Sequence, residues 1–224
     1  MLQQTQVGRV AAVYDNFLAQ FPTPKAMAGA GPAAVITAWG RLGYPRRARR
    51  LWEAAVTIDA HGWPADLSAL PGVGRYTAGA VAAEADGADV PAVDVNVRRV
   101  LERVRGRRLT TTEAERAMVE VAHPLRARDR LLALMDVGAL LCRPRDPRCS
   151  ECPLRPRCAT RGPSADDRRS RQPPFAGSFR QQRGRVMARL REGPVRATDV
   201  DADALASLVN DGLAVVEDGT ASLP

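Results

Sequence analysis

Four cysteines could bind a metal centre, because they all fall in one short run. They are Cys142, Cys149, Cys152 and Cys158, with the spacing C-x6-C-x2-C-x5-C. Thiolates this close in sequence can bind Zn²⁺ or an iron–sulfur cluster. Zinc sites of four cysteines usually contain two C-x2-C pairs, whereas this run contains one. The spacing therefore favours an iron–sulfur cluster, with zinc and disulfides as the alternatives.

Arginines surround these cysteines. Five of them lie within the run: Arg143, Arg145, Arg148, Arg155 and Arg157. A loop held rigid by a metal centre would present their guanidinium groups to phosphates. A basic loop that is simply solvated is the alternative.

A glycine-containing turn is the second feature that can do chemistry. In LPGVGRYTAGAVAAEA, Gly72, Val73 and Gly74 come directly before a helix predicted to begin near Arg75. Two glycines allow a tight turn whose backbone N–H groups point outward at a helix N-terminus, where they can bind an anion. A plain turn between helices is the alternative. The preceding Leu-Pro, and Asp94 at the predicted start of a later helix, favour the anion-binding turn.

Helical periodicity dominates the elements that must position these residues. Apolar side chains recur at three- and four-residue spacing through most of the chain. The predicted helices cover about residues 7–21, 33–42, 47–62, 75–85, 97–104, 112–125 and 128–142. An alternating strand pattern is missing from the sequence until its last residues. The sequence therefore predicts an all-α core.

The composition changes after Gly162. Residues 164–184 are rich in Pro, Gly, Ser, Gln and Arg and are predicted to form a basic linker. Beyond it, the sequence predicts two helices and a short extended pair, at about residues 183–192, 201–212 and 213–224. This order resembles a miniature winged helix, so residues 185–224 are expected to form a small C-terminal tail domain.

The charge balance limits the partners of this protein. The 224 residues include 33 Lys plus Arg and 25 Asp plus Glu, which gives a net charge of +8, and Lys25 is the single lysine. A net basic chain is attracted to nucleic acid or to an anionic membrane surface. The sequence contains no apolar run near the ~20 residues of a membrane span and no signal peptide. We therefore expect a cytoplasmic protein with reduced thiols.

Several stretches, in this order, resemble the helix-hairpin-helix DNA glycosylases of the endonuclease III superfamily: LPGVGRYTAGA, VDVNVRRVL, MDVGALLC and the cysteine run. MLQQTQV and LGYPRRAR narrow the resemblance to the adenine DNA glycosylase branch. The resemblance covers about residues 1–163. It implies a two-lobed fold, with a six-helix barrel lobe at residues 1–88 and a cluster lobe at residues 89–163. It also implies a [4Fe–4S] cluster on the four cysteines and DNA contacts at the Gly72–Gly74 hairpin.

The resemblance further implies base excision repair of double-stranded DNA. Members of this branch extrude an adenine mispaired with 8-oxoguanine or guanine and hydrolyse its glycosidic bond, since a base inside a duplex is out of reach. The resemblance places Gln4 and Thr5 on the 8-oxoguanine side, and Tyr44 as the wedge with Leu42 beside it. A Tyr44 that merely packs on Pro45 is the alternative. We expect such a protein to be a monomer associated with the nucleoid.

Asp94, Asn96 and Tyr76 are the residues that the resemblance places at the reacting sugar. Cleavage of the glycosidic bond develops positive charge on the sugar, which a neighbouring carboxylate stabilises. Asp94 is expected to be that carboxylate, although it also suits the N-cap of the following helix. Asn96 would orient the sugar or the water. Relatives that also cleave the strand carry a lysine nucleophile at position 76, so Tyr76 predicts a monofunctional enzyme.

The sequence departs from the family pattern at both ends. The general acid of the family is a glutamate two residues before the methionine that is Met1 here. General acid catalysis is typically worth about 10²–10⁴-fold, so this chain would be impaired without it. We expect a start site further upstream, because Asp94, Tyr44 and the cysteines are intact. The tail is also shorter than the domain that recognises 8-oxoguanine in many relatives.

Three other functions remain open on the sequence. A defective copy would be an inactive, cluster-containing protein that binds DNA without excising a base. An endonuclease III-like glycosylase of another specificity would share the same motifs. A zinc-containing regulator that binds DNA would share the cysteine run and the basic charge.

Overall fold

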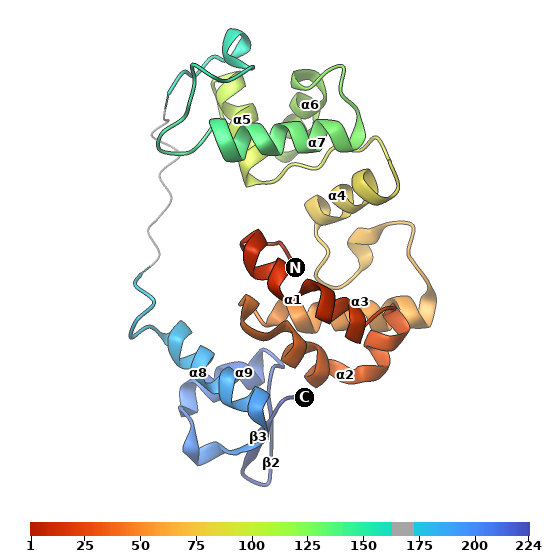
Figure 1. Ribbon diagram of the computed structural model, residues 1–224, viewed down its shortest axis with the longest axis vertical. Coiled ribbons are helices and arrows are strands. Elements are labelled where there is room, and N and C mark those ends of the chain that lie inside the picture. The colour runs from red at the N-terminus through yellow and green to blue at the C-terminus, as the bar shows by residue number, and fades with distance from the viewer. Residues whose placement is uncertain (163–172) are drawn as a thin grey trace. The chain divides into compact units, whose positions relative to one another are not determined.

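The computed structural model describes residues 1–162 and 173–224, and most of these residues are helical (Figure 1). They divide into two compact units. The first unit consists of Met1–Ala65, Ala69–Gly72 and the described residues after position 172. The second unit consists of Asp66–Ser68 and the described residues from Val73 onward to Gly162. The predicted all-α core is confirmed.

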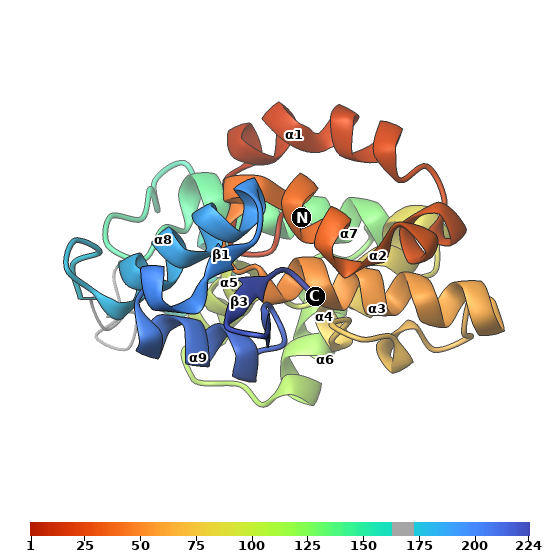
Figure 2. The ribbon, with the colours of Figure 1, turned by 90° about the horizontal axis from the view of Figure 1, so that it is seen from below.

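The first unit begins with three long helices and a short 3₁₀ turn. Their bounds are α1 (Val7–Gln20), α2 (Pro24–Trp39), η1 (Gly40–Leu42) and α3 (Arg46–His61). Helix α2 packs against both α1 and α3 (Figures 1 and 2). It starts where the Thr23 hydroxyl accepts the N–H of Ala26 at 3.1 Å, a favourable N-cap. Another 3₁₀ turn, η2 (Leu67–Ala69), follows α3 in the chain.

The C-terminal tail contains the two helices and the extended pair that the sequence predicted, and a further short strand, β1, lies between the helices. Its elements are α8 (Phe179–Glu192), β1 (Val195–Arg196), η6 (Ala197–Asp199), α9 (Ala202–Asn210), β2 (Val215–Glu217) and β3 (Thr220–Ser222). The strands form an antiparallel sheet in the order β1-β3-β2. Ala221 of the central strand β3 lies opposite Val195 of β1 on one side and Val216 of β2 on the other. Helix α8 begins inside the stretch predicted to be the linker. Residues 164–172 of that predicted linker lie outside the described residues.

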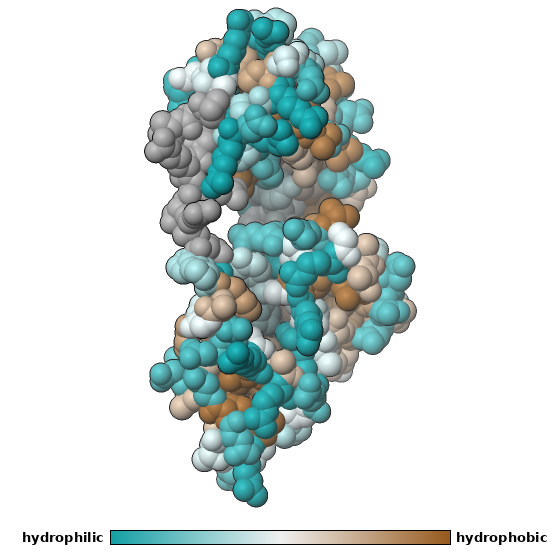
Figure 3. Space-filling view, turned by 60° about the vertical axis from the view of Figure 1, so that its left-hand side comes forward, coloured by the Kyte–Doolittle hydropathy of each residue, from teal (hydrophilic) through white to brown (hydrophobic). Residues whose placement is uncertain are grey.

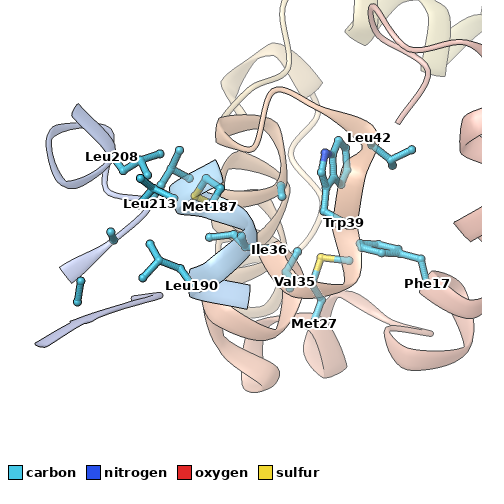
Figure 4. Packing of buried hydrophobic residues seen from close by; sticks show 14 of the residues in the cluster. Phe17, Met27, Val35, Ile36, Trp39, Leu42, Met187, Leu190, Leu208 and Leu213 are labelled. Carbon is cyan, nitrogen blue, oxygen red and sulfur yellow. The ribbon is translucent and has the colours of Figure 1, made fainter. Parts of the chain in front are cut away.

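One hydrophobic core joins the tail to α1–α3. Ile36 of α2 and Leu208 of α9 are fully buried in it, and Met187 and Leu190 of α8 belong to the same cluster (Figure 4). Burying a side chain of this size contributes about 1.5–3 kcal/mol relative to exposing it. The tail is therefore packed into the first unit instead of standing apart from it.

The second unit is built from four further helices and the cysteine loop. Their bounds are α4 (Arg75–Ala85), α5 (Val95–Arg105), α6 (Thr111–Val121) and α7 (Ala127–Asp136), followed by the π-helical turn η3 (Val137–Leu141) and the 3₁₀ turn η4 (Arg155–Arg157). Helix α5 contacts α6, α7 and η3. The apolar stripe predicted on α5 forms its buried side, where Val97 and Leu101 are fully buried. This packing fixes both α5 and the residues at its start.

The ends of α5 and the start of α6 have well-defined caps. Asp94 is the N-cap of α5, and Gly106, with a φ of 68°, ends the helix in the left-handed region that favours glycine. Thr110 and Glu113 form a capping box at α6, where each side chain accepts the other residue's backbone N–H. These caps determine where the chain leaves each helix.

The face shown in Figure 3 is mostly hydrophilic on both units, with smaller apolar areas between the polar side chains. Such a mixture is usual for a protein surface. Among the helices that the structure describes, none has the length and the apolar composition needed to cross a bilayer.

Candidate functional site

Asp94 lies at the half-buried N-terminus of α5, where its carboxylate has several donors. Its Oδ1 accepts the backbone N–H groups of Asn96 at 2.9 Å and Val97 at 2.7 Å. Its Oδ2 accepts the side-chain amide of Asn96 at 2.8 Å. These hydrogen bonds make Asp94 the N-cap of α5, as predicted. The same hydrogen bonds also fix the position of its carboxylate.

Asn96 is held in turn by Arg99, which is 8% exposed. Both terminal nitrogens of Arg99 donate to Asn96 Oδ1 at 3.2 Å. The same guanidinium donates to the carbonyls of Gly138 at 2.7 Å and Cys142 at 2.8 Å. Arg99 therefore links Asp94, through Asn96, to the start of the cysteine loop. Sequence reasoning missed Arg99.

Arg103 lies one helical turn further along α5 and contacts the cysteine loop itself. It is 4% exposed. Its Nη1 lies 3.3 Å from Cys142 Sγ and 3.0 Å from the carbonyl of Arg143, and its Nη2 lies 3.1 Å from the carbonyl of Pro144. The signal in the sequence was a pair of arginines, four residues apart, beside the apolar stripe of α5. That signal is weak in a chain with so many arginines.

The four predicted metal ligands come together in the second unit. Cys142, Cys149, Cys152 and Cys158 are free thiols, and all four line one pocket together with Arg103. Burial raises the pKa of Cys142, although the hydrogen bond from Arg103 and the charge of Arg103 lower it in part. Burial also raises the pKa of Cys158, and charge on Cys149 and Cys152 adds to the effect. The thiols are thus near enough to one another to interact electrostatically.

The arrangement of the thiols bears on which metal centre they can hold. Within the described part of the chain, no three candidate ligands are close enough together to hold a single metal ion. A structural zinc ion needs all four sulfurs at about 2.3 Å from one point. In a [4Fe–4S] cube each thiolate binds a different iron, so the four sulfurs stand further apart. Four thiols that line one pocket are a donor set that fits an iron–sulfur cluster.

Tyr76 lies on α4, half-buried against the core of the second unit. Its hydroxyl is 3.9 Å from Met135 Sδ. Burial raises the pKa of Tyr76, and the charges of Asp94 and Glu84 raise it further. The phenol therefore stays neutral at physiological pH. It is not a primary amine and cannot form a Schiff base.

The glycine turn has the local conformation that the sequence predicted. Gly72 has a φ of 78°, and a Cβ added there would lie 2.8 Å from Arg50 Cβ. Gly74 is the N-cap of α4, where no side chain of the described residues caps the helix. A helix N-terminus that begins at a glycine carries a partial positive charge that attracts anions.

The residues expected to read the lesion lie in the first unit. Gln4 and Tyr44 both have positive φ angles, 55° and 49°, which are rare outside glycine. Tyr44 is 52% exposed, whereas Leu42 is 3% exposed and belongs to the core. The Thr5 hydroxyl donates to the Leu42 carbonyl at 3.3 Å, so the segment of Gln4 is tied to η1. Tyr44 therefore presents its ring to solvent, while Leu42 contributes to packing.

Comparison with known proteins identifies the family to which this chain belongs. The profile of the HhH-GPD superfamily of base excision DNA repair proteins matches residues 1–124. The chain belongs to this superfamily. Its structure is similar to that of a thermostable thymine-DNA glycosylase, with a TM-score of 0.62 and 28% identity over 70% of this chain and 78% of the other. The predicted helix-hairpin-helix glycosylase fold is confirmed.

Within the superfamily, the similar proteins are adenine DNA glycosylases. The enzyme of Mycolicibacterium smegmatis is 41% identical over 95% of this chain and 80% of its own length. The enzyme of Mycobacterium tuberculosis is 42% identical over 100% of this chain and 83% of its own length. The resemblance to the adenine DNA glycosylase branch is confirmed by these relatives. A non-covalent endonuclease III–DNA complex shares the fold, with a TM-score of 0.61 at 24% identity over 70% of this chain and 77% of the other.

Proposed function

We propose that this protein is a monofunctional DNA glycosylase that removes adenine mispaired with 8-oxoguanine or guanine. The observation that carries the proposal is the carboxylate of Asp94, fixed at a half-buried helix start by Asn96 and, through it, by Arg99. The similarity to adenine DNA glycosylases supports the choice of base.

Asp94 supplies the negative charge that the reaction needs. As the bond to adenine breaks, positive charge develops on the sugar, and a carboxylate that is already oriented stabilises it without further reorganisation. Asn96 donates to Asp94 at 2.8 Å and keeps the carboxylate plane fixed. Water then attacks the sugar, which makes the reaction a hydrolysis.

The departing adenine needs a proton. The resemblance assigns this role to a glutamate two positions before the methionine that is Met1 here, so the assay compares the 224-residue chain with an extended chain that carries this glutamate. Tyr76 is a neutral phenol, which supports hydrolysis without strand cleavage through a Schiff base.

We propose that the four cysteines hold a [4Fe–4S] cluster. The four cysteines would hold the cluster, and a cluster held there would brace the loop between Cys142 and Cys158. Arg145 and Arg155 are exposed in this loop and carry charge that suits DNA phosphates. Arg103 contacts Cys142 Sγ from α5, so the loop and the catalytic helix are held together.

The partner in this proposal is double-stranded DNA, bound by one protein monomer. We propose that Gln4 and Thr5 face 8-oxoguanine and that Tyr44 enters the step vacated by adenine. The exposure of the Tyr44 ring supports a wedge role. The position of Gly72–Gly74 at the N-terminus of α4 supports a contact with a phosphate.

Single-turnover assays test the function directly. The extended chain is mixed in excess with duplexes that contain A·8-oxoguanine, A·G or A·T, and the released adenine is measured. We expect release from the first two duplexes only, without strand cleavage and without borohydride trapping. Tight binding of the first duplex with no release would identify the inactive, DNA-binding alternative. Release of another base would point to a different glycosylase specificity.

A further inference from the structure

Arg47 occupies an unusual place in the first unit. Its guanidinium carbon lies 5.3 Å from the ring centroid of Trp39 and 5.2 Å from that of Tyr44. Both distances are within the range of cation–π attraction. Trp39 is buried at the end of α2, whereas Tyr44 is exposed, so Arg47 connects the exposed ring to the core.

The same guanidinium holds the N-terminal segment. Its Nη1 donates to the carbonyl of Gln3, and its Nη2 donates to Thr5 Oγ1 at 2.8 Å. Further contacts reach the carbonyls of Met1 at 3.2 Å and Gly43 at 3.5 Å. The terminal nitrogens are thus occupied by groups of the protein.

The remaining donor of Arg47 is buried without a partner. Its Nε has no hydrogen-bond acceptor among the described residues. Burial lowers the pKa of Arg47, and the nearby Tyr44 opposes this effect only in part. A guanidinium placed this way is poorly suited to bind a DNA phosphate, because its free nitrogen is enclosed and the other two are engaged.

The two segments that Arg47 joins both have strained backbones. Gln4 and Tyr44 adopt φ angles of 55° and 49°. Residues other than glycine persist in this region only when their surroundings hold them there. The Gln3 carbonyl and the Thr5 hydroxyl lie on either side of Gln4, and both accept from Arg47. The Gly43 carbonyl, directly before Tyr44, accepts from Arg47 and also from the Trp39 indole at 2.9 Å.

We propose that Arg47 is a positioning residue that holds the Gln3–Thr5 segment and Tyr44 in one arrangement, so that the two segments engage the lesion as a single unit. The role of these segments at the lesion rests on the proposed function. The coupling between them rests on the contacts of Arg47 alone. Lysine cannot replace Arg47, since an ammonium lacks the planar fork that reaches both segments while stacking on two rings.

The coupling is tested first without DNA. Amide hydrogen exchange is compared in the holoprotein and in the variants Arg47→Met and Arg47→Lys. We expect both variants to speed exchange at Thr5 and Tyr44 together by at least threefold, with the interior of α3 unchanged. Arg46→Met is the matched control, because Arg46 is an exposed neighbour that pairs with Asp211 at 3.4 Å. Unchanged exchange at either segment in Arg47→Met would overturn the proposal.

A double-mutant cycle then tests the coupling on DNA. Thr5→Val and Tyr44→Ala are made singly and together in an Asp94→Asn background, and the dissociation constant for an A·8-oxoguanine duplex is measured. We expect the two changes to be non-additive by at least threefold with Arg47 present and additive in Arg47→Met. Coupling that persists in Arg47→Met, or that Arg47→Lys restores, would contradict the proposal.

The experiments distinguish a failure of the inference about Arg47 from a failure of the proposed function. If the extended wild-type chain releases no adenine and does not prefer the lesion duplex, the proposed function fails. The exchange experiment still decides whether Arg47 couples the two segments. If adenine is released and the exchange of Arg47→Met equals that of the wild type, only the inference about Arg47 fails.

Discussion

Arg99 donates to Asn96 Oδ1 through both of its terminal nitrogens, each at 3.2 Å. Only an oxygen can accept these hydrogen bonds, so the amide nitrogen of Asn96 must face Asp94, where it lies 2.8 Å from Oδ2. The orientation of Asn96 is therefore determined by its two charged neighbours. This relationship makes Arg99 part of the support of the carboxylate that we propose to be catalytic.

Replacing Arg99 by methionine should lower excision by about 10²-fold, because misplacing a catalytic group by about 1 Å can cost this much. The change also leaves the carbonyls of Gly138 and Cys142 without a donor, at a cost of about 1–3 kcal/mol. Single-turnover rates and thermal unfolding measure the two effects. Arg105→Met is the control, since Arg105 lies on the same helix and pairs with Glu120 at the surface. Full activity in Arg99→Met would show that Asn96 does not need this support.

Asp94→Asn should abolish excision while the fold remains stable. Asparagine caps helices about as well as aspartate, so α5 should lose less than about 0.5 kcal/mol, whereas the charge that faces the sugar is lost. We expect excision to fall at least about 10³-fold, with duplex affinity nearly unchanged. Asp94→Ala should lose excision and also about 1 kcal/mol of stability, because it removes the cap. Residual excision near the wild-type rate in Asp94→Asn would exclude Asp94 as the catalytic carboxylate.

Gly138→Ala should impair excision from a distance. A Cβ at Gly138 would lie 3.0 Å from Asn96 Cβ and 3.1 Å from its carbonyl oxygen, so Asn96 must move. We expect a loss of about tenfold or more in the single-turnover rate. Gly184→Ala is the matched control, because an added Cβ meets no described heavy atom within 4 Å there. That control should keep full activity and gain about 0.5–1 kcal/mol, since Ala favours a helix over Gly.

Cys152→Ser tests the metal centre. Removing one of four thiolate ligands should abolish the bound iron and sulfide and the visible colour, and the loop between Cys142 and Cys158 should become sensitive to protease. Iron, sulfide and zinc are measured in the purified wild type and in the variant. A colourless wild-type protein that contains one zinc ion would contradict the cluster. A stable, metal-free variant with normal DNA affinity would contradict a structural role for it.

The sequence predicted the features that depend on local patterns. The apolar stripe of α5 anticipated the burial of Val97 and Leu101, and the close spacing of the cysteines anticipated a shared pocket. The arginines that are partly or fully buried could not be predicted in the same way. The chain has 33 Lys plus Arg, so charge alone does not distinguish Arg47 or Arg99 from the solvated majority. Their burial follows from tertiary contacts with segments far away in the sequence.

The packing of the C-terminal tail against α3 could not be predicted from local sequence patterns either. Arg49 on α3 donates to the Asp211 carbonyl at 3.2 Å, although more than half of the chain separates the two residues. No local pattern predicts that pair. The two helices and the final extended pair of the tail were predicted because each follows from its own short stretch of sequence, whereas the short strand β1 was missed.

Gly212→Ala should loosen the docked tail, because a Cβ at Gly212 would overlap the guanidinium group of Arg49. The side chain of Arg49 must then leave its place, and its hydrogen bond to the Asp211 carbonyl is lost. Gly219→Ala is the matched control: Gly219 has a similarly positive φ of 73°, but an added Cβ there meets no described heavy atom within 4 Å. Both variants carry the backbone cost of about 1–3 kcal/mol. Only Gly212→Ala should also expose α8 and α9 to hydrogen exchange, and Arg49→Ala should produce a similar exposure, because it removes the same hydrogen bond. Equal exchange in the two glycine variants would show that the contact with Arg49 does not hold the tail.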